Sequence, residues 1–176
     1  MQRIGDSLSQ VFRIHLIPLT GFPEITPGDL LGDLIFNKCL EICRISPSSV
    51  LFKKSILEHV GLFDDDLHVC EDYDLWLRIT LNHKILFIDE PLIIKYGGHS
   101  DQLSKNIDGI EVYRIRSLEN LLRNEKIKRD DRLLATEMLL SKLNIYYNGC
   151  IKRGKKESAE ETIEKIKFWK KNIIEY

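Results

Sequence analysis

The chain has 176 residues, of which 43% are hydrophobic and 30% are charged, and its formal net charge is −1. This composition is typical of an ordinary folded domain with a core of its own, and it excludes a disordered chain. A net charge so close to zero gives no basic field that would attract nucleic acid or an anionic membrane, so neither is an expected partner.

The N-terminal stretch "VFRIHLIPL" (11–19) is interrupted by Arg13 and His15 and is too short for a signal sequence or a membrane span. We therefore expect no membrane span and a cytoplasmic protein. The four cysteines are scattered, without a C-x-x-C pair, and we expect them to be reduced and mostly buried.

The first half of the chain predicts short elements. Residues 1–33 contain four of the ten glycines and three of the five prolines, without a clean periodicity, and predict a loop-rich lead-in. Apolar residues at helical spacing predict a helix over 34–45 that ends before Pro47. The β-branched, apolar stretch Ser48–Phe52 predicts a buried strand. A short helix follows, with Ser55 as N-cap, Glu58 as its capping-box partner and Gly61 as the stop.

After a polar turn, "CEDYDLWLRI" opens a helix that extends from Cys70 to about Asn82. Two strands follow, Lys84–Glu90 and Leu92–Tyr96, separated by Pro91. From about Asp108 the pattern is helical only, which predicts a helical hairpin and one more helix with a capping box that starts at Ser158.

These elements predict a mixed α/β (α+β) fold in three parts. Residues 1–33 form the lead-in, residues 34–106 form an α/β unit, and residues 107–176 form a C-terminal helical extension.

Three carboxylates stand in the first turn of the helix that starts at Cys70, where the helix dipole stabilises negative charge. Asp74 is four residues from Arg78, which predicts a surface ion pair. Glu71 lies at the flank. Asp72 aligns with the apolar stripe of the helix and is predicted to face its buried side, where a carboxylate has the makings of a general base. Ordinary helix capping is the alternative interpretation of all three acids. The stripe consists of Leu75, Trp76 and Ile79.

The stretch "SPSSVLFKKSILEHVGLFDDDLHVCEDYDLWLRI" (46–79) closely resembles the acceptor-side half of family 2 glycosyltransferases, enzymes with the GT-A fold that use nucleotide-diphosphate sugars. The resemblance includes the Gly-x-Phe-Asp turn that starts at Gly61, and Glu71-Asp72 before Leu-Trp-Leu-Arg. It continues through "ILFIDEPLIIKYGGHSDQLS" (85–104) and covers about residues 34–106. It implies a partial GT-A-like domain that lacks the N-terminal nucleotide-binding half and is followed by the C-terminal helical extension.

The resemblance also implies roles for individual residues. By position, Asp72 takes the part of the base that removes a proton from the acceptor hydroxyl, which then attacks the anomeric carbon of the sugar with inversion. Glu71 orients the acceptor or its neighbours. His99 stands where some relatives have a metal or diphosphate ligand, although a polar turn histidine is the plainer reading. The residues that would contact the acceptor or the diphosphate are Ser48, Ser49, Gln102 and Ser104.

The sequence also departs from the family pattern, because residues 1–33 contain no counterpart of the half that binds the nucleotide and ends in a metal-binding Asp-x-Asp motif. Asp64-Asp65-Asp66 spells such a motif but falls in the turn after Gly61, so we interpret it as a solvated turn. A divalent metal, Mg²⁺ or Mn²⁺, is implied, with its main ligands absent from this chain.

We therefore expect a fragment, or one chain of a split enzyme, that is inactive alone. Its partners in the complete enzyme are a nucleotide-diphosphate sugar donor and a glycan or other hydroxyl acceptor. Strands that should pair with the missing half would leave an open sheet edge that invites self-association.

Two other functions stay open at this point. The first is a non-catalytic binding or regulatory module derived from a glycosyltransferase, which docks a partner through the C-terminal helices. The second is a metal-dependent hydrolase, which lacks a compact ligand motif such as HExxH. That hydrolase would use Asp64, Asp66, Asp72 and His99.

Overall fold

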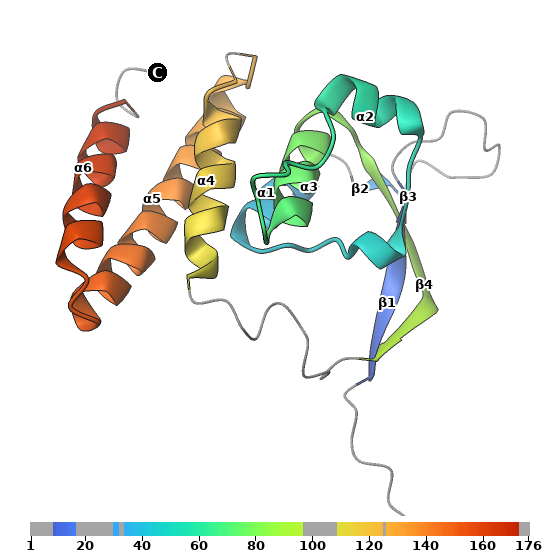
Figure 1. Cartoon of the computed structure of the whole chain (residues 1–176). Coiled ribbons are helices and arrows are strands. Elements are labelled where there is room, and N and C mark those ends of the chain that lie inside the picture. The colour runs from blue at the N-terminus through green and yellow to red at the C-terminus, as the bar shows by residue number, and fades with distance from the viewer. Residues whose placement is uncertain (1–8, 17–29, 32–33, 97–108, 125, 173–176) are drawn as a thin grey trace, which may run out of the picture.

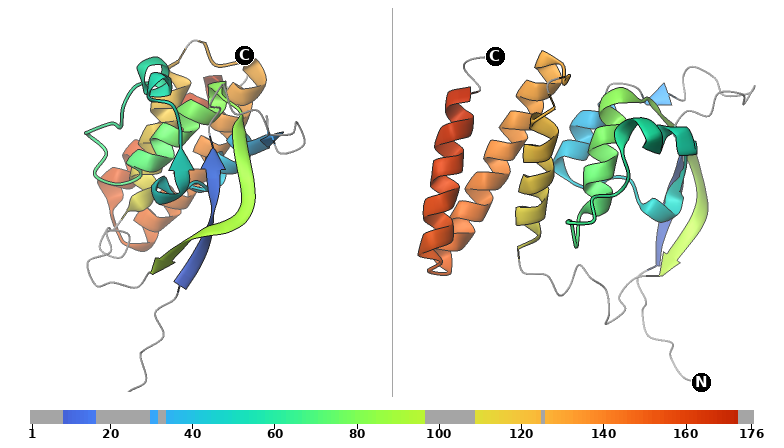
Figure 2. Two further views of the ribbon diagram at one scale, coloured as in Figure 1. Left: turned by 90° about the vertical axis from the view of Figure 1, so that its right-hand side faces the viewer. Right: turned by 45° about the horizontal axis from the view of Figure 1, so that its top comes forward.

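We analysed a computed structural model of the chain, which describes residues 9–16, 30–31, 34–96, 109–124 and 126–172. Helices α1 and α3 lie in the middle of the molecule, with a small sheet on one side and the C-terminal helices α4, α5 and α6 on the other (Figures 1 and 2). The predictions about His99, Gln102 and Ser104 concern residues outside the part of the chain that the structure describes. None of the described helices combines the length and the apolar character needed to cross a bilayer.

The sheet has the strand order β2-β4-β1-β3. The strand β1 (Ser9–Leu16) pairs antiparallel with β4 (Ile85–Tyr96) along its whole length and parallel with β3 (Val50–Leu51). The strand β2 (Leu30–Leu31) pairs antiparallel with the start of β4. The lead-in that was expected to be loop-rich thus contributes β1, a central strand of the sheet. The edge strands β2 and β3 have two residues each, and self-association through a sheet edge stays a prediction.

The six helices of the described part fall into two groups. Three short helices come first: α1 (Leu34–Glu41), α2 (Lys54–Val60) and α3 (Glu71–Asn82). The longer helices α4 (Ile110–Leu122), α5 (Arg129–Lys152) and α6 (Lys156–Asn172) follow, which confirms the prediction that the C-terminal part is helical.

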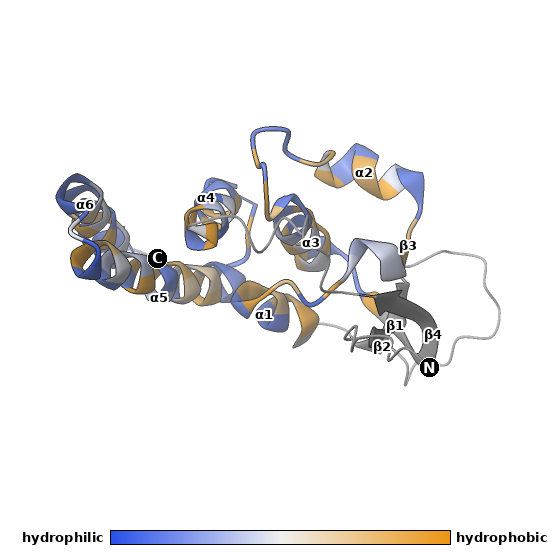
Figure 3. Cartoon of the chain, turned by 60° about the horizontal axis from the view of Figure 1, so that its bottom comes forward, coloured by the Kyte–Doolittle hydropathy of each residue, from blue (hydrophilic) through white to orange (hydrophobic). Residues whose placement is uncertain are grey.

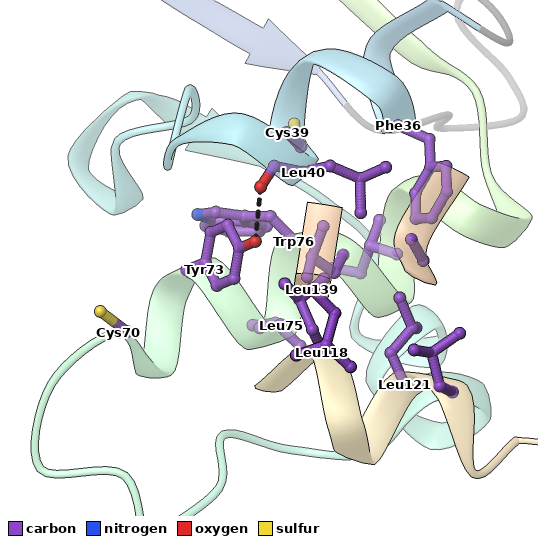
Figure 4. Close-up of a cluster of buried hydrophobic side chains, with 14 of the residues drawn as sticks. Phe36, Cys39, Leu40, Cys70, Tyr73, Leu75, Trp76, Leu118, Leu121 and Leu139 are labelled. Carbon is purple, nitrogen blue, oxygen red and sulfur yellow. Dashed lines mark hydrogen bonds between the residues drawn. The ribbon is translucent and has the colours of Figure 1, made fainter. Parts of the chain in front are cut away.

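The main core lies where α3 packs against α1 and α4, and where α5 closes over α1 and α4. The helix α4 turns its hydrophobic side toward α5 (Figure 3). Full burial of one large apolar side chain contributes about 1.5–3 kcal/mol, so this contact between helices outweighs their weak intrinsic propensities. The largest fully buried side chains include Trp76, Tyr73, Leu40, Leu75, Ile79, Leu118, Leu139 and Leu143 (Figure 4).

The expectation of a mixed α/β fold with a partial GT-A-like domain is wrong. Helices supply most of the described residues, and two of the four strands have only two residues each. The reason is that α4 and α5 pack directly on α3 and α1, so that the core of the molecule is formed mainly between helices.

The strand expected over Ser48–Phe52 is reduced to Val50–Leu51, because a turn of 3-10 helix occupies Pro47–Ser49. The carbonyl of Ser46 accepts two hydrogen bonds from Ser49, one from its backbone N–H and one from its hydroxyl, both at 2.9 Å. These bonds turn the chain where an extended strand was predicted.

The short helix α2 starts two residues earlier than predicted. Its N-cap is Lys53 rather than Ser55, so the predicted capping box with Glu58 does not form. Its end at Gly61 is confirmed, with a φ of +87° that favours glycine. In the same way, α6 begins at Lys156, before the predicted cap.

The two strands predicted on either side of Pro91 are one continuous strand, β4. Pro91 pairs with Arg13, and the register shifts on both sides of Arg13. A proline cannot donate a ladder hydrogen bond, and a local irregularity of this kind is where a sheet tolerates one.

Candidate functional site

The candidate site lies at the N-terminal end of α3, which follows a left-handed residue. Cys70 is the N-cap of α3 and has a φ of +64°, although it is not a glycine. The carbonyl of Cys70 accepts the first helical hydrogen bond, from the N–H of Asp74, at 3.0 Å. The three acids of the motif therefore occupy the first turn of the helix, as predicted from the sequence.

Asp72 is half-buried in this first turn. Its Oδ1 accepts a hydrogen bond from the N–H of Tyr73 at 2.7 Å. The carboxylate also lies beside the thiol of Cys43, at the end of α1. Burial first, and then the neighbouring Asp72 carboxylate, raise the pKa of Cys43 far above its ordinary value. The thiol of Cys43 is therefore protonated at neutral pH beside Asp72.

Trp76 follows Asp72 by one helical turn and is almost completely buried, with 2% of its surface exposed. Its ring packs edge-on against Phe52, with the ring centroids 6.3 Å apart and the planes at 76°. The indole Nε1 is buried and has no hydrogen-bond partner among the described residues. The structure thus has a buried, fixed donor on the same helix face as Asp72.

The other residues expected at the acceptor site have local roles in the structure. Glu71 is half-buried beside Asp72. Ser48 is exposed and its hydroxyl lies 3.0 Å from that of Ser46. Ser49 is buried and donates to the carbonyl of Ser46. These hydroxyls stabilise the turn before β3. Their contact with an acceptor stays a prediction.

The expectation that Asp74 and Arg78 form a surface pair is wrong in one respect. The pair exists, with two hydrogen bonds of 2.7 and 2.9 Å, but Asp74 is only 5% exposed. The loop after α2 covers this side of α3, and Arg78 also donates to the carbonyls of Val60 and Leu62. Burial raises the pKa of the Asp74 carboxyl, and the Arg78 guanidinium opposes that rise.

The acidic turn Asp64–Asp66 is held by its own bonds. The N–H of Asp66 donates to Oδ1 of Asp64 at 3.0 Å, and its carboxylate pairs with Arg116 of α4 at 3.0 Å. Within the described ranges, no three His, Cys, Asp or Glu side chains gather to hold a metal ion. The described residues therefore provide no group of ligands for the implied Mg²⁺ or Mn²⁺, and His99, which the hydrolase would also use, lies outside them.

A buried polar cluster near the site was missed by sequence reasoning. The Tyr73 hydroxyl donates to the carbonyl of Leu40 at 2.7 Å, and Nζ of Lys142 donates to the carbonyl of Glu41 at 2.9 Å (Figure 4 shows the first bond). Lys142 also lies 3.5 Å from Glu111. The sequence does contain a signal, because Lys142 interrupts an apolar stripe at helical spacing on α5.

The cysteines agree with the sequence-based expectation. All four are free thiols, of which three are buried and Cys43 is half-buried. Burial raises the pKa of Cys39 and of Cys70 to about 11 each, so these thiols are protonated at neutral pH.

The chain is similar to three rickettsial proteins named uncharacterized glycosyltransferase. The proteins of Rickettsia felis and Rickettsia conorii are each 33% identical to it over 110 residues, which is 58% of this chain and 18% of the relative. The protein of Rickettsia typhi is 30% identical over 135 residues, which is 73% of this chain and 38% of the relative. No protein-family model and no solved structure matches the chain.

The matched region therefore spans less than half of each relative's own length. These similarities support a relationship of the chain to glycosyltransferases.

Proposed function

We propose that this chain is the acceptor-binding part of an inverting, nucleotide-sugar-dependent glycosyltransferase of the family 2 type, with Asp72 as the catalytic base. The observation that carries the proposal is the position of Asp72, a half-buried carboxylate in the first turn of α3 above the buried ring of Trp76. The helix N-terminus favours the ionised form of a carboxylate there. The three glycosyltransferase relatives give independent support.

In the proposed reaction, Asp72 accepts the proton of the acceptor hydroxyl as its oxygen attacks the anomeric carbon of the donor sugar. The bond between the anomeric carbon and the diphosphate oxygen breaks, and the nucleotide diphosphate leaves with that electron pair. A hydroxyl is a poor nucleophile, and a positioned base contributes about 10²–10⁴-fold to the rate. Glu71, at the flank of the same turn, orients the acceptor.

We expect the donor sugar to be bound by a further protein segment. The chain matches only 18–38% of the length of its relatives, which leaves room for such a segment in proteins of this kind. The described residues provide no group of ligands that would hold a metal ion, so the roles proposed for them involve none. The divalent cation implied by the resemblance stays a prediction about the complete enzyme.

A binding or regulatory module that docks through the C-terminal helices is less well supported. The helices α4 and α5 bury Leu118, Leu139 and Leu143 in the main core. Arg116 and Lys142 in addition bond to Asp66 and to the carbonyl of Glu41. These inward faces are therefore occupied within the chain, and a partner would have to dock on outward residues such as Ile145 and Phe168, which are exposed.

The decisive variant is Asp72→Asn in the full-length or reconstituted enzyme. We expect it to fold normally, because the exchange keeps an oxygen that accepts from the N–H of Tyr73, but to lose about 10²–10⁴-fold of its transfer rate. Release of nucleotide from a panel of nucleotide sugars measures the rate, and circular dichroism checks the fold. Asp65→Asn, an exposed acid in the neighbouring turn, is the matched control and should retain full activity.

If Asp72→Asn retained the wild-type transfer rate, Asp72 would only stabilise the N-terminus of α3 and would not be the base. We expect the chain alone to release no nucleotide, and turnover by the unaided chain would contradict the proposal of a separate donor-binding segment. A complete enzyme that folds and binds a sugar but transfers none would favour the non-catalytic module. Metal-dependent cleavage of a simple phosphate ester would favour the hydrolase.

A further inference from the structure

The indole of Trp76 is an anomaly in the core. Its Nε1 is buried and lacks a partner among the described residues, although the side chain is only 2% exposed. The great majority of buried polar groups in native proteins are paired, and leaving a buried donor unpaired is costly. The second tryptophan of the chain behaves normally, because Nε1 of Trp169 donates to Glu119 at 3.4 Å.

The surroundings of Trp76 fix the direction of its N–H group. The ring packs edge-on against Phe52 in the same buried cluster as Tyr73, whose hydroxyl donates to the carbonyl of Leu40. In Figure 4 the nitrogen is at the end of the indole nearer to Cys70, the residue before α3. Helical side chains lean toward the helix N-terminus, and residues four apart lie on one face. The donor is therefore directed toward the turn that contains Asp72.

We propose that the indole N–H of Trp76 binds the acceptor, by donating a hydrogen bond to the hydroxyl oxygen whose proton Asp72 accepts. A hydroxyl group both donates and accepts, so a carboxylate and an N–H on the same helix face form a matched pair for it. The ligand class is a hydroxyl-bearing molecule such as a sugar. The inference rests on the proposed function and adds to it the contact that holds the acceptor oxygen.

The two residues have different parts in this arrangement. Asp72 takes up the proton, whereas Trp76 forms no bond that changes during the reaction. A donor directed at a lone pair of the nucleophile does not make that oxygen more reactive. Trp76 is therefore a binding residue, and its loss should raise the KM for the acceptor while kcat changes little.

The direct test uses the two indole N–H signals of the ¹⁵N-labelled full chain, which Trp169→Phe assigns. Methyl α-D-glucopyranoside, methyl β-D-galactopyranoside and N-acetylglucosamine are titrated in turn. We expect at least one of these sugars to move the Trp76 signal downfield, as a new hydrogen bond requires, while the Trp169 signal stays in place as the internal control. A Trp76 signal that no sugar moves overturns the proposal.

A second measurement uses the reconstituted enzyme. Trp76→Phe keeps an aromatic ring but removes the donor, and we expect about a tenfold rise in acceptor KM with kcat within about twofold. Trp169→Phe is the matched control and should change neither constant. An unchanged acceptor KM in Trp76→Phe contradicts the proposal.

The titration also separates this inference from the assignment of the base. A Trp76 signal that still moves, combined with full transfer by Asp72→Asn, would refute the base and keep the Trp76 contact. Loss of transfer by Asp72→Asn with an unmoved Trp76 signal would keep the base and refute the contact.

Discussion

At the scale of single residues, two neighbouring acids of α3 lie in different surroundings. Asp74 accepts two hydrogen bonds from the guanidinium of Arg78. The same guanidinium donates to two carbonyls at the end of α2 and in the loop after it, so Asp74 serves the fold. Asp72 is half-buried beside the thiol of Cys43, and no ion pair within the described residues engages its carboxylate. The helix wheel placed Asp72 on the buried side and Asp74 on the surface, whereas Asp74 is the more buried of the two because the loop after α2 covers it.

Lys142 gives a prediction at this scale. Its side chain is 6% exposed and Nζ donates to the carbonyl of Glu41, so Lys142→Met would leave that carbonyl without this donor. We expect a loss of about 1–3 kcal/mol in the free energy of unfolding, measured with urea. Lys165→Met is the control, because Lys165 is 48% exposed and its pair with Glu119 should contribute less than about 1 kcal/mol.

The difference in stability between the wild type and Lys142→Met is also predicted to depend on pH. Burial lowers the pKa of Lys142 in the folded state from 10.5. Between the lowered value and 10.5 the unfolded chain binds more protons than the folded chain, so the contribution of Lys142 to stability rises with pH. The gap in stability between the wild type and Lys142→Met should therefore widen as the pH approaches 10.5. A gap that narrows would contradict this assignment.

At the scale of elements, two glycines predict opposite effects of the same substitution. Gly61 ends α2 with a φ of +87°, and an added Cβ would lie 3.3 Å from Nη1 of Arg78. Gly61→Ala should destabilise the chain by about 1–3 kcal/mol. Gly149 lies within α5, where alanine is the better helix former by about 1 kcal/mol and the close neighbour is the flexible end of Arg153.

Thermal unfolding of both variants measures the difference. Gly149→Ala should raise the midpoint, whereas Gly61→Ala should lower it. Equal shifts in one direction would show that the backbone conformation at Gly61 does not decide the end of α2.

The elements also show what the sequence can and cannot predict. The helix over α3 and the three C-terminal helices follow from apolar spacing, which is a local signal. The failures depend on long-range contacts. The strand β1 is formed by pairing with β4, and Pro91 is tolerated by a register shift against Arg13. For the candidate site, the sequence indicated the face of Asp72, but the unpaired Nε1 of Trp76 is visible only in the packed structure.

At the scale of the whole molecule, the C-terminal helices are part of one core. The sequence suggested a boundary near residue 107, because strands give way there to helices. In the structure, Leu118 of α4 and Leu139 of α5 are completely buried in the same cluster as Leu75 of α3. Lys142 of α5 reaches the last turn of α1 next to the candidate site. The arrangement of α1 and α3 therefore depends on α4 and α5.

Truncation tests this dependence. A chain that ends at residue 108 would expose the faces of α1 and α3 that now pack on α4 and α5, and we expect it to lose cooperative unfolding in urea. A chain that ends at Gly154 lacks only α6, whose buried residues are Ala159, Thr162 and Ile166, and should keep a cooperative transition at lower stability. Dispersed amide signals from the chain ending at 108 would instead show that the part before the helices folds alone. In that case the helical extension would be a separate domain, and Lys142 would not be needed to shape the end of α1 beside Asp72.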